Sequence, residues 1–90
     1  MKRLKIEVFG DVQGVFYRHF LADAAKRLKL NGWCRNEPDG SVYIIIESVN
    51  KEKLEKFLRA CKKGSPLSVV ERVETDEEDF WENLQGFEVR

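Results

Sequence analysis

The residues best suited to chemistry lie in one short stretch, residues 10–18, which reads Gly-Asp-Val-Gln-Gly-Val-Phe-Tyr-Arg. Two glycines let successive backbone N–H groups point at one spot, and a helix beginning near Tyr17 would add unpaired N–H groups with partial positive charge. The guanidinium of Arg18, in the first turn of that helix, could close the site with paired hydrogen bonds. The stretch therefore indicates an anion-binding loop, although glycines also occur in ordinary strand–helix connections.

A second candidate is Asn36, which ends the run of residues 32–36 just before a turn. Asparagine is common at such positions because it favours turns. An amide cannot act as a general base near neutral pH, but it can hold a water molecule by donating and accepting hydrogen bonds. Arg18 opposes the positive end of its own helix, which costs stability unless an anion joins it. The two residues together predict an anion site with an oriented water.

Hydrophobic spacing predicts the elements that position these residues. Leu4, Ile6 and Val8 alternate with charged residues and predict a half-buried strand before the glycine loop. Apolar residues at three- and four-residue spacing predict an amphipathic helix over residues 17–29. Similar reasoning predicts strands over residues 30–36, 41–48, 69–75 and 86–90, and a second helix from an N-cap at Asn50 to a stop at Gly64 and Pro66.

Finer features refine this pattern. A Pro-Asp-Gly turn at residues 37–40 predicts that the two strands around it form a hairpin. The isoleucines at residues 44–46 indicate burial on both faces and hence a central strand. The valines of residues 69–73 do not alternate cleanly, which favours a bulge. The acidic run of residues 76–79 is interpreted as a solvated loop, and Phe87 and Val89 are expected to face one way.

The predicted order is β-α-β-β-α-β with a short last strand. That order is typical of the α+β ferredoxin-like sandwich, in which two helices cover one face of an antiparallel sheet. Residues 1–90 contain no repeat or linker, so we expect a single domain. This fold hosts many functions, and the site has to be argued from its own residues.

Composition narrows the class of protein. The chain has 90 residues, of which 42% are hydrophobic and 36% charged, as in globular proteins. Residues 1–36 hold eight Lys/Arg and three Asp/Glu, a net charge of +5, whereas residues 37–90 hold eight and thirteen, a net charge of −5. The net charge of zero for the whole chain argues against a nucleic-acid-binding domain, and the positively charged residues 1–36 contain the glycine loop. No apolar stretch resembles a membrane span or signal peptide, so we expect a cytoplasmic protein.

Cysteine and histidine usage limits the available catalytic groups. Cys34 and Cys61 are the two cysteines, and we expect both to be buried free thiols in a reducing compartment. His19 is the single histidine, and no Cys/His set has the spacing of metal ligands. A zinc site or a histidine-based triad is therefore hard to build, and no metal is expected.

Two motifs resemble those of one family. Residues 10–18 resemble the acylphosphatase signature Gly-x-Val-Gln-Gly-Val-x-Phe-Arg, with Tyr17 where phenylalanine is usual. The family's second block, Gly-Trp-Val-x-Asn followed by Asp-Gly, is similar to residues 32–40, with Cys34 in place of valine. The turn at residues 64–66, the valine-rich strand and residues 86–90 are also similar. The resemblance thus spans essentially the whole chain and is that of a small free-standing acylphosphatase.

The resemblance implies hydrolysis of the carboxyl–phosphate anhydride of acyl phosphates to a carboxylate and inorganic phosphate, without a metal or cofactor. It also implies two catalytic residues, Arg18, which binds the phosphoryl group, and Asn36, which holds the attacking water. The implied phosphate-binding residues are Val12, Gln13, Gly14, Val15, Phe16, Tyr17 and Arg18. The expected partners are a small-molecule acyl phosphate and inorganic phosphate, with no nucleic acid and no membrane, and we expect a monomer.

Besides Cys34, the chain departs from the family pattern at Lys29 and Tyr17, and two other functions stay open. Lys29 stands where a glycine usually ends the first helix, and Tyr17 adds a hydroxyl that needs a partner if buried. His19 has no role in the family pattern. An RNA-binding module would use strand aromatics such as Trp33 and Tyr43 for base stacking. An acylphosphatase-like domain of a larger maturation enzyme is the other alternative, which the single predicted domain disfavours.

Overall fold

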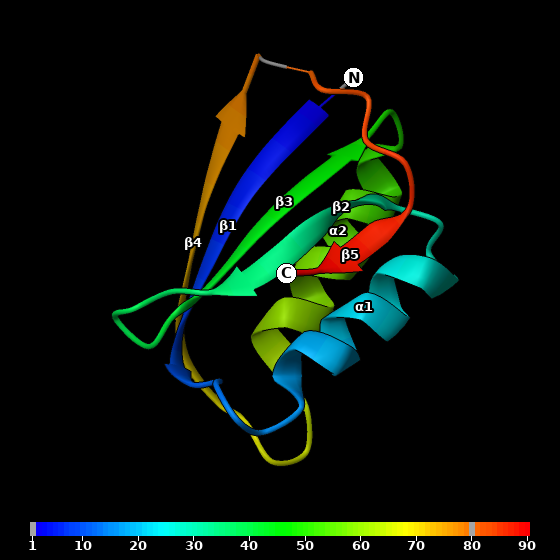
Figure 1. Ribbon diagram of the computed structural model, residues 1–90. Coiled ribbons are helices and arrows are strands. Elements are labelled where there is room, and N and C mark those ends of the chain that lie inside the picture. The colour runs from blue at the N-terminus through cyan, green and yellow to red at the C-terminus, as the bar shows by residue number, and fades with distance from the viewer. Residues whose placement is uncertain (1, 80) are drawn as a thin grey trace.

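The computed structural model describes residues 2–79 and 81–90. A five-stranded sheet carries two helices on one face (Figure 1). This is the ferredoxin-like α+β sandwich that the element order predicts. The elements are β1 (Lys2–Asp11), α1 (Tyr17–Arg27), β2 (Asn31–Asn36), β3 (Val42–Ser48), α2 (Lys51–Lys63), β4 (Val69–Glu78) and β5 (Phe87–Val89).

The sheet has the strand order β4-β1-β3-β2-β5, which places β3 in the centre. Ile44, Ile45 and Ile46 are all at most 1% exposed, so the prediction of a central strand is confirmed. The β2–β3 hairpin is also confirmed. The pairs β4–β1, β1–β3 and β3–β2 are antiparallel, whereas β5 pairs with β2 in parallel. In this edge strand Phe87 packs in the core while Val89 is exposed.

The acidic run of residues 76–79 is the main error of the sequence interpretation, because three of its members belong to a strand. Asp76, Glu77 and Glu78 continue β4 beyond the predicted end. They pair in register with the basic end of β1, where Arg3 faces Glu78 and Lys5 faces Asp76. Opposite charges across an antiparallel pair favour strand pairing, and this explains why a polar segment extends the sheet.

A bulge in β4 explains why Gly10 is needed near the end of β1. The register between β1 and β4 shifts between Phe9 and Gly10, as the irregular valine spacing predicted. Gly10 has φ 133°, and a Cβ there would overlap the backbone oxygen of Val69. Only glycine allows this close approach of two backbones. The bulge therefore fixes where β1 ends and where the following loop begins.

Helix α1 ends two residues earlier than the sequence predicted, at Arg27, and Lys29 adopts the left-handed conformation with φ 56°. The N–H of Lys29 donates to the carbonyl of Lys26, and the N–H of Leu30 donates to the carbonyl of Ala25. This is the Schellman arrangement, in which glycine is usual at the left-handed position. Lys29 therefore bears the backbone strain that glycine would avoid at this position.

The core lies between the sheet and the two helices, and it contains both cysteines as free buried thiols, as expected. Tyr17 is also buried, and its hydroxyl donates to the carbonyl oxygen of Cys61 at 2.8 Å. The extra hydroxyl of Tyr17 therefore has the partner that its burial requires. Among the helices of residues 2–79 and 81–90, none is long and apolar enough to cross a membrane.

A buried ion pair holds the end of the sheet that is distant from the glycine loop. Arg3 and Glu47 are 7% and 2% exposed, and the Arg3 Nη1 lies 3.0 Å from the Glu47 Oε2. The backbone N–H groups of Glu82 and Leu84 also donate to the Glu47 carboxylate, at 2.6 and 2.7 Å. Burial raises the pKa of Glu47, but these hydrogen bonds and Arg3 outweigh it, so the pKa lies below its usual value. Glu47 thereby anchors the segment that leads into β5.

Candidate active site

The loop between β1 and α1 presents a run of backbone donors. Gly14 has φ 73°, and Phe16 has φ 59° and ψ 19°, so two nearby residues are left-handed. Alternation of this kind turns successive N–H groups toward one side. Within the described residues, the N–H groups of residues 13–19 donate no hydrogen bond to another part of the chain. The loop is therefore a ready-made set of donors for an anion.

The start of α1 extends this set of donors. Phe16 occupies the N-cap position, no described side chain caps the helix, and the first turn holds no acidic residue. The first turn instead contains Arg18 and His19. An uncapped helix N-terminus has unpaired N–H groups and partial positive charge, so an anion there would be stabilised. Both features favour a negatively charged ligand in front of residues 13–19.

Gln13 fastens the first part of the loop to the β2–β3 hairpin. Its side-chain amide donates to the carbonyl of Glu37 at 2.8 Å and to the carbonyl of Ser41 at 2.9 Å. Both carbonyls lie in the connection that directly follows Asn36. The side chain of Gln13 therefore sets the distance between the loop and the end of β2.

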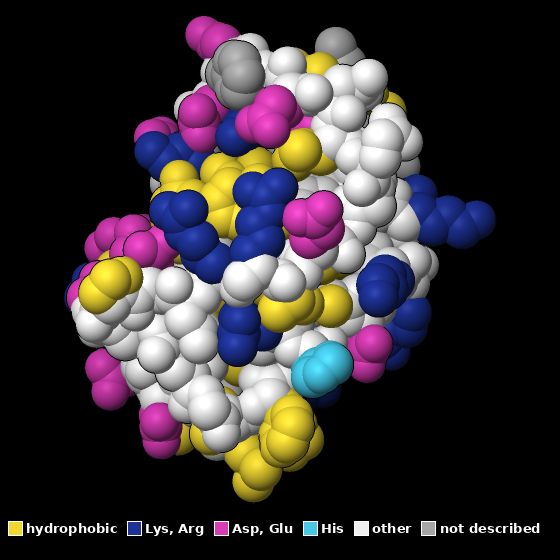
Figure 2. Space-filling view, viewed as in Figure 1, with side chains coloured by type: hydrophobic (Ala, Val, Ile, Leu, Met, Phe, Trp, Pro, Cys, Tyr) yellow, Lys and Arg dark blue, Asp and Glu magenta, His cyan; other side chains and the backbone are white. Residues whose placement is uncertain are grey.

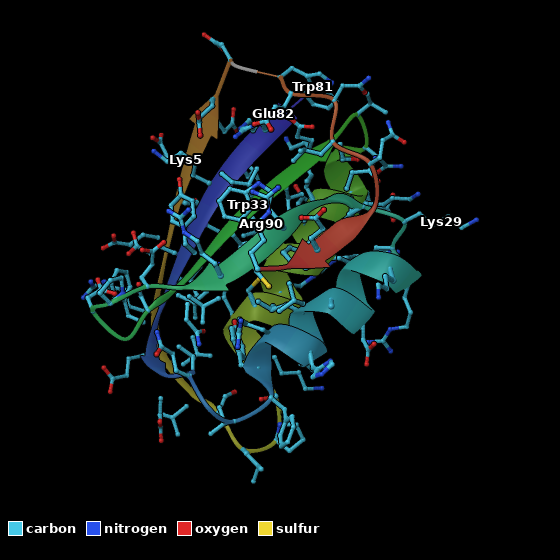
Figure 3. The ribbon with its side chains drawn as sticks, in the orientation of Figure 1. Lys5, Lys29, Trp33, Trp81, Glu82 and Arg90 are labelled. Carbon is cyan, nitrogen blue, oxygen red and sulfur yellow. The ribbon has the colours of Figure 1, made fainter. Side chains whose placement is uncertain are left out.

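Arg18 lies half-buried, with its guanidinium against the end of β5. Its Nη1 donates to the main-chain oxygen of Arg90 at 2.9 Å, and the N–H of Arg90 donates to the carbonyl of Cys34 at 2.7 Å. Figure 3 shows the Arg90 side chain beside Trp33, and its guanidinium lies 4.5 Å from the centre of that ring. Arg90 thus links Arg18 to β2, and one side of the Arg18 guanidinium is positioned before any ligand arrives.

Asn36 is on the helix-covered face of the sheet, as Cys34 is, because side chains two residues apart on a strand share a face. Its partner across the hairpin, Val42, belongs to the same core. The Oδ1 atom of Asn36 is buried and accepts no hydrogen bond from the described residues. An unpaired buried acceptor costs about 1–3 kcal/mol, so its presence calls for an explanation such as a bound water or a catalytic role.

The structure therefore brings both predicted catalytic residues to one end of the sheet. Arg18 donates to the main-chain oxygen of Arg90, and the N–H of Arg90 donates to the carbonyl of Cys34 on β2. Asn36 lies two residues beyond Cys34 on the same strand. Two contributions were not found from the sequence, namely that of Arg90 and that of the Gln13 side chain. Arg90 acts through its backbone, which has no residue signature, and the bonds of the Gln13 side chain depend on the loop geometry. Only the topology, which sets β5 beside β2, could have indicated Arg90.

Neither buried thiol nor the histidine offers an obvious nucleophile or base. Burial raises the pKa of the Cys34 thiol to about 12, although the nearby Arg18 guanidinium lowers it in part. The thiol therefore stays protonated and unreactive at neutral pH. His19 is exposed, and its ring centre lies 6.3 Å from that of Phe16. Across residues 2–79 and 81–90, no three His, Cys, Asp or Glu residues form a group that could hold a metal ion.

Comparison with known proteins gives a consistent picture. The model of the acylphosphatase family matches residues 4–89. An acylphosphatase of Rubrobacter xylanophilus is 42% identical over 89 residues, which cover 99% of this chain and 80% of that protein. The crystal structure of acylphosphatase from Bacillus subtilis has a TM-score of 0.95 and 37% identity, and the match covers 100% of this chain and 99% of that one.

A larger protein also contains a similar unit. The crystal structure of full-length HypF in the phosphate- and nucleotide-bound form matches with a TM-score of 0.86 and 26% identity. The match covers 99% of this chain but 12% of that one. The same fold thus occurs both as a small protein and as a part of a much longer chain.

Proposed function

The chain belongs to the acylphosphatase family and is an enzyme of that type, and from this premise we propose how it hydrolyses acyl phosphates. The phosphoryl group binds to the backbone N–H groups of residues 12–17 and to the guanidinium of Arg18. A water held by Asn36 attacks phosphorus. The reaction uses no metal ion and no general base from the protein.

The bond changes of this reaction balance without a further reactant. The water oxygen forms a bond to phosphorus, and the bond from phosphorus to the bridging oxygen breaks with its electron pair leaving on the carboxylate. A phosphoryl oxygen takes the water proton, so an acyl phosphate dianion and water give a carboxylate and dihydrogen phosphate. A carboxylate is a good leaving group, which is why no acid has to protonate it. Charge in a loose phosphoryl-transfer transition state lies largely on the equatorial oxygens.

The observation that carries the proposal is the run of unpaired donors at the uncapped start of α1. The left-handed backbone at Gly14 and Phe16 and the side-chain bonds of Gln13 orient these N–H groups, so little reorganisation is needed when charge builds on the phosphoryl oxygens. Arg18 adds a permanent positive charge, and its bond to Arg90 holds it in place beforehand. A preorganised set of this kind stabilises a transition state more than it would in water, where dipoles must first turn.

Asn36 supplies the component that the loop lacks. Its buried, unpaired Oδ1 can accept from a water once the side chain or its neighbours adjust, while its amide N–H₂ can donate. The Gln13 side chain keeps this strand end close to the loop. Positioning of water and phosphorus within one site lowers the entropic part of the barrier.

RNA binding is disfavoured by the arrangement of the strand aromatics. Trp33 is 7% exposed, and the guanidinium groups of Arg35 and Arg90 lie 5.2 and 4.5 Å from its ring centre. The same Arg35 lies 5.2 Å from the ring centre of Tyr43. Rings that are covered by arginines in this way do not offer an open face on which a base could stack.

Phosphate release from benzoyl phosphate, measured in the presence of a chelator, tests the proposal. We expect release that is unaffected by the chelator and that is nearly lost in Arg18→Ala. Arg59→Ala, which removes an exposed arginine of α2 that does not belong to the loop, serves as the matched control and should keep its rate. Release that requires an added metal, or that is equal in the Arg18→Ala variant, would contradict the proposal.

A further inference from the structure

An apolar groove lies directly beside the phosphate-binding loop and has no role in the reaction as described so far. Its volume is about 370 Å³, and it is lined by Val15, Phe16, His19, Phe20, Asp23 and residues 65–67. Phe16 and Leu67 are 73% and 68% exposed, so the groove presents two large apolar side chains to solvent. Figure 2 shows hydrophobic side chains gathered at this end of the molecule, next to the histidine.

The groove is continuous with the proposed phosphate site because the two share residues. Val15 and Phe16 give their N–H groups to the loop and their side chains to the groove. The Oγ of Ser65 lies 3.5 Å from the carbonyl oxygen of Val15, which places the 65–67 turn against the same part of the loop. A ligand whose phosphoryl group fills the loop would therefore have its other end within reach of Phe16 and Leu67.

The side from which water attacks phosphorus determines which end of the substrate faces the groove. In an in-line displacement the attacking and leaving oxygens lie on opposite sides of phosphorus. Gln13 fastens the first part of the loop to the hairpin next to Asn36, whereas Val15 and Phe16 adjoin the 65–67 turn. Water entering from the Asn36 side would thus expel the carboxylate toward Phe16.

We propose that this groove binds the acyl group, and that the enzyme prefers acyl phosphates with a neutral, apolar or aromatic acyl chain. This inference rests on the proposed function. The exposed Phe16 ring, whose centre lies 6.3 Å from that of His19, offers a face for an aryl group. Asp23 at the groove margin disfavours an acyl chain that ends in a carboxylate.

The test compares benzoyl phosphate with acetyl phosphate in the wild type and in two groove variants. Leu67→Ala removes groove surface without touching the phosphate loop, and Phe16→Ala removes the ring. Val49→Ala is the matched control, since Val49 is 75% exposed and does not line the groove. The intrinsic reactivities of the two substrates cancel because only the ratio of their kcat/KM values is compared between variants.

We expect Leu67→Ala to lower the benzoyl-to-acetyl ratio about threefold through KM for benzoyl phosphate. Its acetyl phosphate activity and its inhibition by inorganic phosphate should stay as in the wild type. Phe16→Ala should lower the ratio about tenfold, which corresponds to about 1.4 kcal/mol. Val49→Ala should leave the ratio unchanged.

Two outcomes would overturn the inference, and they differ from each other. Hydrolysis of both substrates with the wild-type ratio in Leu67→Ala and Phe16→Ala would overturn the acyl groove but leave the proposed function intact. If the wild type hydrolyses neither substrate faster than Arg18→Ala does, the proposed function fails and this inference fails with it.

Discussion

The two helices of this sandwich begin in opposite ways, although both are amphipathic and pack on the same face of the sheet. Helix α2 has Asn50 as its N-cap, whose side chain accepts from the N–H of Lys53 at 3.1 Å, and Glu52 lies in its first turn. Helix α1 begins at a left-handed Phe16 with no side-chain cap, and its first turn holds Arg18. Figure 1 places these two helix starts at opposite ends of the molecule.

The difference teaches where the chain uses polar groups for stability and where it reserves them for a ligand. The Asn50 cap satisfies one of the orphan N–H groups of α2, and the first-turn Glu52 offsets its partial positive charge. The α1 terminus forgoes both contributions and adds a cation that its own dipole disfavours. The same contrast separates Glu47, which accepts from two backbone N–H groups and Arg3, from Asn36 Oδ1, which accepts from none of the described residues.

The largest expected effect is on catalysis and concerns Arg18 at the start of α1 and Asn36 at the end of β2. Arg18→Ala and Asn36→Ala should each lower kcat/KM for an acyl phosphate by at least a hundredfold, because each removes a preorganised group worth about 2.7–4 kcal/mol of barrier. Their unfolding free energies should change by less than about 1 kcal/mol, since Arg18 opposes the helix dipole. Near-normal rates in both variants would show that the unpaired groups at the start of α1 and the end of β2 are not used for catalysis.

The second largest expected effect is on the free energy of unfolding and concerns the buried Arg3–Glu47 pair. Glu47→Gln should lower the unfolding free energy by about 3 kcal/mol, because Arg3 loses its buried charged partner. Urea denaturation measures this loss, and Glu55→Gln, on the exposed face of α2, is the control. A loss no greater than that of Glu55→Gln would show that this cluster does not anchor the fold.

Acid should weaken the ion pair and the backbone hydrogen bonds of the Glu47 carboxylate. The pKa of Glu47 is lowered in the folded state, so the carboxylate binds protons more readily when unfolded. Its contribution is therefore fully present above the unfolded pKa of about 4.3 and is lost as pH falls through the lower folded value. Denaturation midpoints measured from pH 6 downward should fall less in Glu47→Gln than in the wild type. An identical fall in both proteins would contradict the assignment.

The α2 cap gives a smaller effect that separates stability from activity. Asn50→Ala should lower the unfolding free energy by about 1 kcal/mol and leave kcat/KM unchanged, because the cap is distant from the loop. Thermal denaturation and steady-state rates of the same preparation measure both quantities. A drop in kcat/KM that matches the loss of Arg18 would show that the two helix starts are not independent.

The smallest effect comes from giving α1 the first-turn acid that α2 has. His19→Glu should raise the unfolding free energy by about 0.3–1 kcal/mol through the helix dipole, yet weaken inhibition by inorganic phosphate several-fold. Lys53→Glu makes the equivalent change at the third position of α2 and should leave phosphate inhibition unaltered. Tighter phosphate inhibition in His19→Glu would contradict an anion site at this terminus.

Much of this arrangement could be predicted from the sequence because it depends on local patterns. The spacing of the isoleucines placed β3 in the centre, and Asn50 marked the start of α2. The acidic end of β4 could not be predicted, since its partners Arg3 and Lys5 are more than 70 residues away along the chain. The Arg18–Arg90 bond was missed for the same reason.

The site residues themselves were predicted through two motifs, and their roles stay proposals. The structure adds the geometry that motifs do not contain, such as the unpaired Asn36 Oδ1 and the Gln13 side-chain bonds. The sequence showed that Lys29 stands where glycine is usual, and the structure adds that Lys29 adopts the left-handed conformation there, with φ 56°. A cytoplasmic location and a monomeric state stay predictions that no observation tests.

The central claim is that the backbone N–H groups of residues 12–17 and the guanidinium of Arg18 bind phosphate. Titration of the isotopically labelled chain with inorganic phosphate, followed by amide NMR, tests it most directly. We predict saturable shifts confined mainly to the amides of residues 12–17 and the Arg18 side chain, with the amides of residues 51–53 unchanged. No shift in the loop, or equal shifts at the two helix starts, would contradict the account.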